Sequence, residues 1–151
     1  MKLAEALAER AEAMRRYEQL LKRIHRSVRV QEGDQPAEDP SDLLGEANSI
    51  LDRVDLLIRR INKTNIATAF DDKSSLTDAI AHRDILNQRR RLYADAAGRA
   101  STTQERYTRN EVKFVAAVDV RALQHEHDRL ADEYRALDTT LQRLNWTSDL
   151  L

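Results

Sequence analysis

Residues 40–61 read PSDLLGEANSILDRVDLLIRRI, and this stretch decides the fold. Its apolar residues recur in alternating steps of four and three, the spacing of a buried stripe along an α-helix. The stripe consists of Leu43, Ala47, Ile50, Val54, Leu57 and Ile61. A second row beside it consists of Leu44, Leu51 and Ile58. Because the two rows make a wide apolar face, we expect this helix to contact more than one neighbour, as helices do in a bundle.

The start of this helix is marked by its capping residues. Asp39 suits the N-cap, and Pro40 suits the first helical position because its fixed φ is already helical. The ten residues from 31 to 40 hold one glycine, both prolines of the chain and four acids. They predict a linker, in which Gly33 lies where a chain leaving a helix tolerates a positive φ.

Three further helices are expected at about 2–27, 76–100 and 119–144, beside the one at about 40–62. The expected buried positions of the first are Leu3, Leu7, Arg10, Met14, Tyr17, Leu21, Ile24 and Val28. Those of the third are Leu76, Ala79, Ile80, Ile85, Leu86, Leu92, Tyr93, Ala96, Ala97 and Ala100. The last helix follows a capping aspartate, Asp119. Its expected seam is Leu123, His127, Leu130, Tyr134, Leu137, Leu141 and Leu144.

The composition agrees with an all-α protein. Charged residues make up 34% of the chain and aromatic residues 5%, and there are only three glycines, a profile typical of long helices. We predict a single domain over residues 1–151, built as an elongated up-down bundle of four long helices. Alternation around Phe114 is typical of a strand, so the prediction includes a short two-stranded β-ribbon that pairs about 27–32 with 112–118.

Charge balance and cysteine content exclude several classes of protein. The 25 Lys and Arg residues against 26 Asp and Glu residues give a net charge of -1, so there is no electrostatic basis for binding nucleic acid. The run 89–91 holds three arginines but no aromatic residue that could stack on bases, so it predicts a solvated helix face, with an anion or RNA contact as the alternative. Without cysteine there is no disulfide and no thiolate metal site.

No apolar run approaches the roughly 18 residues that span a bilayer, and acids interrupt the first ten residues where a signal peptide needs an apolar core. We therefore expect a cytoplasmic protein without a membrane span.

The histidines do not predict a metal centre. His125 and His127 lie two positions apart, so on a helix they point about 200° away from each other and cannot hold one ion. His127 falls in the seam of the last helix, where it predicts an interhelical polar contact, and the roles of both residues stay open. No Glu is followed three residues later by His, which excludes a ferritin-like di-iron site. Since no phosphate-binding glycine loop and no nucleophile motif occur either, we expect no metal, no cofactor and no catalytic residue.

One polar cluster is a candidate for binding a small polar ligand. The end of the second helix and the start of the third are expected at the same pole of the bundle. The candidate residues there are Asn62, Asn65, Asp78, Arg83 and Asp84. Their amide, carboxylate and guanidinium groups could hold such a ligand, while helix capping and loop hydrogen bonds are the alternative role for the same groups.

Several strings resemble a known family. They are Met1-Lys2-Leu3-Ala4-Glu5-Ala6-Leu7, Val30-Gln31-Glu32-Gly33 with Pro36-Ala37-Glu38-Asp39-Pro40, Ile61-Asn62-Lys63-Thr64-Asn65, Leu76-Thr77-Asp78-Ala79 with Arg83-Asp84, Arg106-Tyr107-Thr108-Arg109, Lys113-Phe114-Val115 and Asn145-Trp146-Thr147. In this order over the full length, the chain resembles the septicolysin-like family of small bacterial proteins of unknown function. The resemblance implies an all-helical, oligomeric, soluble bacterial protein, and the family label implies a pore-forming cytolysin. It supplies no catalytic residues.

Three hypotheses about function follow. The first is a non-enzymatic helical interaction protein that associates with copies of itself, because four long helices with wide apolar stripes leave apolar area to cover. The second is a pore-forming, membrane-acting protein, supported by the family label and by the alternation at 112–118. The third is a small-ligand binder that uses the polar residues between positions 62 and 84.

Overall fold

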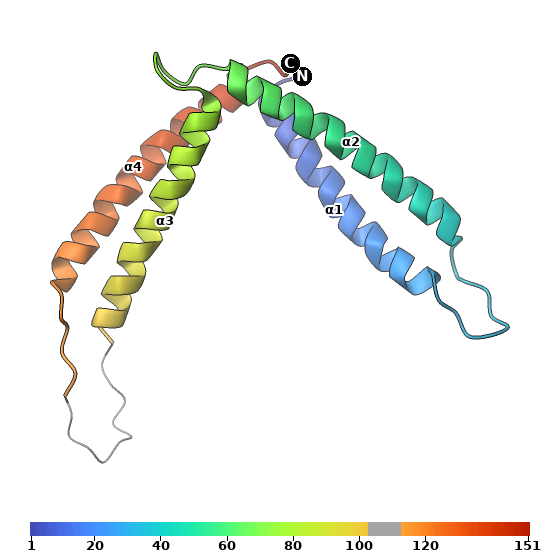
Figure 1. Cartoon of the computed structure of the whole chain (residues 1–151), viewed down its shortest axis with the longest axis horizontal. Helices are drawn as coiled ribbons and strands as arrows, with labels where there is room; N and C mark the ends of the chain where they lie inside the picture. The colour runs from blue at the N-terminus through green and yellow to red at the C-terminus, as the bar shows by residue number, and fades with distance from the viewer. Residues whose placement is uncertain (103–112) are drawn as a thin grey trace. The chain divides into compact units, whose positions relative to one another are not determined.

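The computed structural model describes residues 1–102 and 113–151, and across them the chain is all-α. Its four helices are α1 (Leu3–Ser27), α2 (Pro40–Ala67), α3 (Leu76–Ala100) and α4 (Val120–Thr147) (Figure 1). The described residues contain no strand, only two isolated bridges, Lys2 with Asp149 and Ala69 with Ser75. The predicted four-helix, all-α composition is therefore confirmed, although α2 runs five residues beyond its predicted end.

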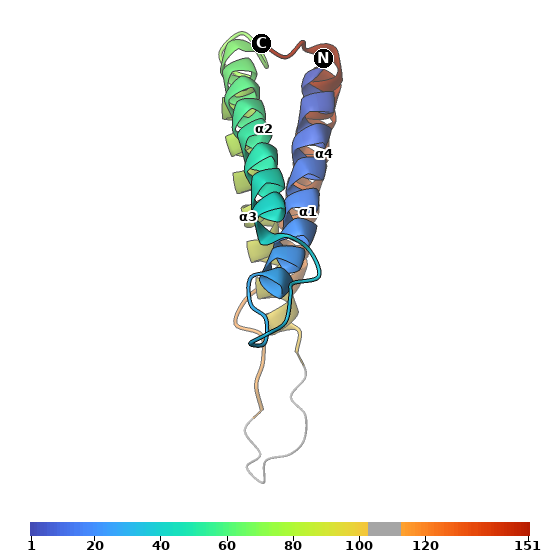
Figure 2. The same cartoon turned by 90° about the vertical axis from the view of Figure 1, so that its right-hand side faces the viewer.

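The chain divides into two compact units. Unit 1 comprises residues 1–76 and 142–151, and unit 2 comprises residues 77–141. In unit 1 the helices α1 and α2 run side by side as an antiparallel hairpin (Figures 1 and 2). In unit 2 the ion pair Arg83–Asp138 joins the helices α3 and α4, and the His82 Nε2 of α3 lies 3.7 Å from the Glu133 Oε1 of α4. The single domain and the up-down bundle stay predictions.

The helix starts follow the local signals in the sequence. The Asp39 carboxylate accepts a hydrogen bond from the Ser41 backbone N at 2.8 Å, directly before Pro40 opens α2. The Asp119 carboxylate accepts one from the Ala122 backbone N at 3.1 Å and caps α4. Gly33 has a φ of 90° in the connection between α1 and α2, a conformation that only glycine adopts without strain. These three predictions are confirmed.

The core of unit 1 contains the predicted stripe of α2. All six stripe residues are buried, and a seventh position in register, Thr64, is buried as well. Leu20 and Ile24 of α1 pack against the first four of them, with Ala13 and Tyr17 beside the cluster. The wide face expected on α2 exists, but only its first row is covered within unit 1, because the second row is exposed.

The buried row of α1 differs from the predicted row at every second position, where the residue that faces α2 is the one directly before the predicted residue. The buried residues of α1 are Leu3, Ala6, Leu20, Ile24 and Ser27. Met14 and Val28, predicted to be buried, are exposed, and Leu7 and Leu21 are only half-buried. Two heptad rows are possible on α1, and both contain Leu3, Tyr17 and Ile24. The row whose other members are smaller faces α2. Small side chains such as Ala6 and Ala13 allow the two helices to approach closely, which the larger row would prevent.

The C-terminal segment is tied into unit 1. The Leu3 backbone N donates to the Ser148 carbonyl at 3.0 Å, and the Leu150 backbone N donates to the Met1 carbonyl at 2.9 Å. The buried Thr64 hydroxyl accepts a hydrogen bond from the Leu151 backbone N at 2.9 Å. Residues 148–151 therefore hold the start of α1 next to the end of α2.

The core of unit 2 is smaller. Leu86 and Ala97 of α3 are buried, as is Leu130 of α4. Ile85 and Leu92 were predicted to lie in this core, but both are exposed. The prediction was wrong because consecutive residues of a helix point 100° apart, so Ile85 and Leu86 cannot both face one neighbouring helix.

The predicted β-ribbon is wrong. Residues 28–32 and 113–118 contain no strand, and Ser27 is the last residue of α1, while residue 112 lies outside the described part of the chain. The two segments belong to different units, and each lacks the neighbouring strand that a short alternating segment needs in order to form a ladder.

Candidate functional site

The predicted ligand-binding residues fall in two units. Asn62 and Asn65 lie on the last two turns of α2 in unit 1, and Asp78, Arg83 and Asp84 lie on the first turns of α3 in unit 2. Neither unit by itself brings the set together. A ligand site made of these residues therefore stays a prediction.

Arg83 has a structural role within unit 2. Its Nη2 donates to the Asp84 Oδ1 at 2.9 Å, and its Nη1 lies 3.5 Å from the Asp138 Oδ1 on α4. Its guanidinium is partly buried between the helices. The pair with Asp138 joins α3 to α4 near the start of α3. A structural contact of this kind was the alternative to ligand binding in the sequence analysis.

The arginine run on α3 also makes local contacts. The Arg90 guanidinium lies 5.0 Å from the centre of the Tyr134 ring and donates to the Asn87 side-chain oxygen at 2.8 Å. Such stacking contributes a cation–π attraction. Arg89 and Arg91 on either side are exposed. The middle arginine is therefore part of the α3–α4 contact, and its neighbours form a solvated face.

The histidines of α4 do not form a metal cluster. Within residues 1–102 and 113–151, no three His, Asp or Glu side chains come together in a way that could hold an ion. The His127 Nδ1 lies 3.1 Å from the Asp128 Oδ1, and the ring borders a hollow of about 490 Å³ between α3 and α4. The hollow exists because the facing residues of α3, Ala94, Ala97 and Gly98, and Ser101 directly after the helix are small. His125 is exposed.

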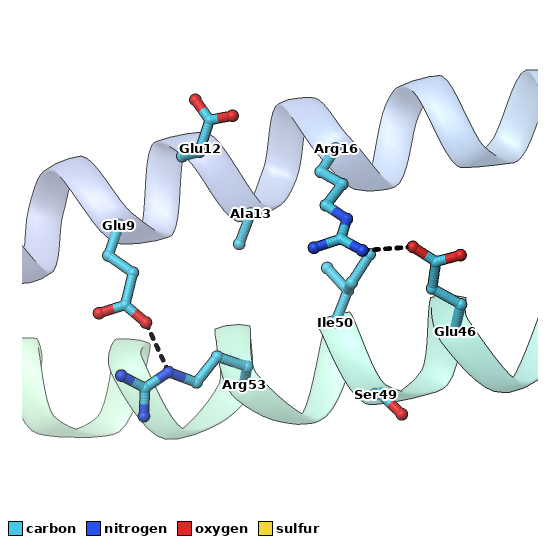
Figure 3. A pocket seen from close by; sticks show the side chains of 8 residues that line it. All are labelled: Glu9, Glu12, Ala13, Arg16, Glu46, Ser49, Ile50 and Arg53. Atoms are coloured by element: carbon cyan, nitrogen blue, oxygen red, sulfur yellow. Dashed lines mark hydrogen bonds and ion pairs between the residues drawn. The ribbon is translucent and has the colours of Figure 1, made fainter.

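A better-defined site lies between α1 and α2. This charge-framed groove has a volume of about 430 Å³ (Figure 3). It is lined by Glu9, Glu12, Ala13, Arg16, Glu46, Ser49, Ile50 and Arg53. Figure 3 shows Ala13 and Ile50 between two ion pairs that cross from one helix to the other. Ala13 and Ile50 form the floor of the groove, and the longer charged side chains form its walls.

The two ion pairs at the ends of the groove have opposite polarity, since the arginine belongs to α2 in one pair and to α1 in the other. The Arg53 Nε of α2 donates to the Glu9 Oε1 of α1 at 2.6 Å, and the Arg16 Nη2 of α1 donates to the Glu46 Oε1 of α2 at 2.6 Å. The hydrogen bond from Arg53 and its positive charge hold the pKa of Glu9 below its usual value of 4.5. Because these side chains are largely solvated, each pair adds little stability. Their main effect is to fix the register of α1 against α2.

Sequence reasoning missed this groove, although a signal for it was present. Glu9 and Arg16 stand seven residues apart on α1, and Glu46 and Arg53 stand seven apart on α2 with the signs reversed. In an antiparallel hairpin such a pattern pairs every charge with an opposite one. The groove between the pairs has an apolar floor and charged walls, and no nucleophile stands beside a base in it.

The opposite flank of the same hairpin is apolar. On α2, one set of residues follows a buried residue by one position: Leu44, Leu51 and Ile58. The groove residues of α2 each precede a buried residue by one position: Glu46, Ser49 and Arg53. Since consecutive residues of a helix point 100° apart, the two sets lie on opposite flanks of α2. The same rule on α1 places Leu7, Met14, Leu21 and Val28 opposite Glu9, Glu12 and Arg16. The apolar face of unit 1 is our name for two rows taken together: Leu44, Leu51 and Ile58 on α2, and Leu7, Met14, Leu21 and Val28 on α1. Its most open members are 37–56% exposed: Met14, Val28, Leu44, Leu51 and Ile58.

The described residues thus define a protein of paired long helices, with an apolar face and a charge-framed groove. The chain belongs to a family of unknown function, DUF6847, whose profile matches residues 10–150. It is similar to a functionally unknown conserved protein from Corynebacterium diphtheriae, known from a crystal structure, with 46% sequence identity and a TM-score of 0.93. The match covers 100% of this chain and 99% of that one. No curated protein matches the chain.

These findings correct the family resemblance drawn from the sequence. Neither the matching family nor the solved structure is described as septicolysin-like or as a cytolysin, so that resemblance is wrong. It rested on short strings, each of which is weak by itself. The pore-forming hypothesis loses the label on which it depended, and residues 113–118, whose alternation also supported it, form no strand. In the described part of the chain, no helix has the length and hydropathy needed to cross a membrane.

Proposed function

We propose that this protein is a non-enzymatic interaction module that associates with copies of itself through its helices. The observation that carries the proposal is the apolar face of unit 1, on which five large apolar side chains remain 37–56% exposed. Covering the exposed part of each side chain would contribute about 1 kcal/mol, or about 5 kcal/mol for one face. Two faces would contribute about 10 kcal/mol, a gain comparable with the about 4–15 kcal/mol that it costs to bring two proteins together.

The polar groups around the groove support the non-enzymatic part of the proposal. Glu9 is held by Arg53 and Arg16 by Glu46, while Glu12 pairs with Arg15 at 2.5 Å. A general base needs a free carboxylate or imidazole within reach of its substrate, whereas these carboxylates already accept hydrogen bonds from arginines. The groove therefore fits a surface for contact.

Sedimentation velocity over a wide range of protein concentration tests the proposal. We expect a species heavier than the 17.4 kDa chain that dissociates on dilution. A single 17.4 kDa species up to the highest attainable concentration would refute self-association. Mass spectrometry of the native protein would, in the same preparation, reveal any small molecule that copurifies.

Binding of a small polar ligand by Asn62, Asn65, Asp78, Arg83 and Asp84 is a second proposal. It is supported by the partly buried Arg83 guanidinium, which already attracts carboxylates from α3 and α4. Replacing both Asp78 and Arg83 by Ala is expected to release a copurifying ligand while the helical circular dichroism stays unchanged. Loss of the helical signal would instead assign these residues a purely structural role.

A cytoplasmic location is proposed with this function. It is supported by a chain without cysteine, which needs no oxidising compartment for its fold. Fractionation of cells that produce the protein tests it, and recovery outside the cytoplasmic fraction would contradict it.

A further inference from the structure

The residues that α1 leaves outside its own hairpin are larger than those it buries there. Towards α2 it directs Ala6 and Ala13, while Leu7 and Met14, one position further on, lie on the apolar face. Burying the larger pair would remove more apolar area from water. A helix that keeps its larger apolar row outside one hairpin has the pattern of a bundle helix, which contacts two neighbours.

The two rows of the apolar face interleave into one surface. The ion pairs Glu9–Arg53 and Arg16–Glu46 set which levels of α1 and α2 lie side by side. In this register Leu51 lies at a level between Leu7 and Met14. By the same register Leu44 lies between Met14 and Leu21. The face is therefore a continuous apolar strip, two helices wide and several turns long, with a large side chain at every half heptad.

The flanks of the α3–α4 hairpin, taken by themselves, do not offer a matching surface. On one flank the positions that follow the partly buried seam residues of α3 and α4 carry Asp84, Arg91, Asp128, Arg135 and Asp138. On the other flank lie Asp78, His82, Arg89, Glu126, Arg129 and Glu133, with the exposed Ile85 and Leu92 between the charged residues of α3. A cover made of either flank would remove charged groups from water, which is costly. The chemistry that matches the apolar face best is another apolar face of the same kind.

A second copy provides that face, and the charges around it permit the contact. The rim carries both signs, with Glu18 and Lys22 on α1 and Asp55 on α2, so two identical rims can meet without a one-sided repulsion. A two-fold contact uses the same patch on both copies. It would place the two rows of one hairpin against the two rows of the other, as in a bundle of four helices.

We propose that the apolar face of unit 1 binds the same face of a second copy about a two-fold axis, so that two α1–α2 hairpins form the dimer contact. This inference rests on the proposed self-association and names its surface. Its central residues are Met14 and Leu51.

Two matched lysine variants of the full-length chain test the surface. Leu51→Lys introduces a charge into the face twice per dimer, whereas Leu56→Lys introduces the same charge on the same helix, away from the face. The two leucines are equally exposed, at 39% and 40%. We expect Leu51→Lys to weaken the dimer at least about tenfold in sedimentation velocity and Leu56→Lys to leave it unchanged. Equal effects of the two variants on a dimeric protein would overturn the surface while leaving self-association intact.

Cysteine crosslinking provides a second readout that does not require a disruptive variant. The chain contains no cysteine, so Met14→Cys introduces a single thiol near the centre of the face. Under mild oxidation we expect it to form a covalent dimer faster than Leu56→Cys does. Equal crosslinking rates would overturn the inference. A monomer whose thiol at position 14 is shielded from a thiol reagent would also overturn it, because the chain would then cover its own face.

Discussion

Replacing Leu57 by Ala should strongly destabilise the protein, because this side chain is fully buried on α2. The substitution removes three carbon atoms from the α1–α2 contact, a loss of about 2 kcal/mol of transfer free energy. The space left behind adds to this cost, so we expect the free energy of unfolding to fall by about 3 kcal/mol. Such a loss would be a large fraction of the about 5–15 kcal/mol that stabilises a typical protein.

Leu56→Ala is the matched control, since it makes the same change one residue earlier on the same helix. Leu56 is 40% exposed, and we expect its truncation to cost less than about 1 kcal/mol. Urea unfolding followed by circular dichroism at one fixed protein concentration measures both variants. If the two substitutions cost the same, the inward face of α2 has been assigned incorrectly and the packing argument for unit 1 fails.

Three further predictions concern single contacts. The lowered pKa of Glu9 means that its pair with Arg53 stabilises the fold above the usual carboxyl range and that this contribution is lost as the pH falls through the lowered value. Thermal unfolding should therefore separate wild type from Glu9→Gln at about pH 7 but not at about pH 2, and a difference that persists in acid would contradict this. Thr64→Val removes the acceptor for the Leu151 backbone N and should cost about 1–2 kcal/mol, with faster hydrogen exchange at residues 148–151. Thr64→Ser should restore slow exchange, and equal exchange in all three proteins would refute the contact. Tyr134→Leu removes the ring under a guanidinium and should lower stability by about 0.5–1 kcal/mol, as measured by urea unfolding, whereas an unchanged midpoint would show that the stacking contributes nothing.

Local signals in the sequence explain much of this structure. The stripe of α2, the cap at Asp39 with Pro40, the cap at Asp119 and the positive φ of Gly33 all depend on residues within one or two turns of one another. Interactions at such short range form in the same way whatever the rest of the chain does. The helical composition of the protein could therefore be predicted from periodicity and capping alone.

The candidate sites could be predicted only in part. The second row of α2 was recognised as an apolar surface, but the groove beside Ala13 was missed, since it exists only where Glu9 meets Arg53 and Arg16 meets Glu46. The predicted ligand site from Asn62 to Asp84 depended on a bundle in which the end of α2 meets the start of α3. That assumption concerns the tertiary arrangement, which periodicity does not contain.

What the sequence determined by itself is the approximate position of each helix and the presence of two apolar rows on α2, whereas on α1 it indicated only the row through Leu7 and Met14. Only the tertiary structure decided which row of α1 faces α2, because both rows have the same heptad spacing. The choice depends on how closely two helix axes can approach, and the small side chains of Ala6 and Ala13 allow an approach that Leu7 and Met14 do not. The same packing decision leaves the larger row exposed and so creates the surface on which the proposed association depends.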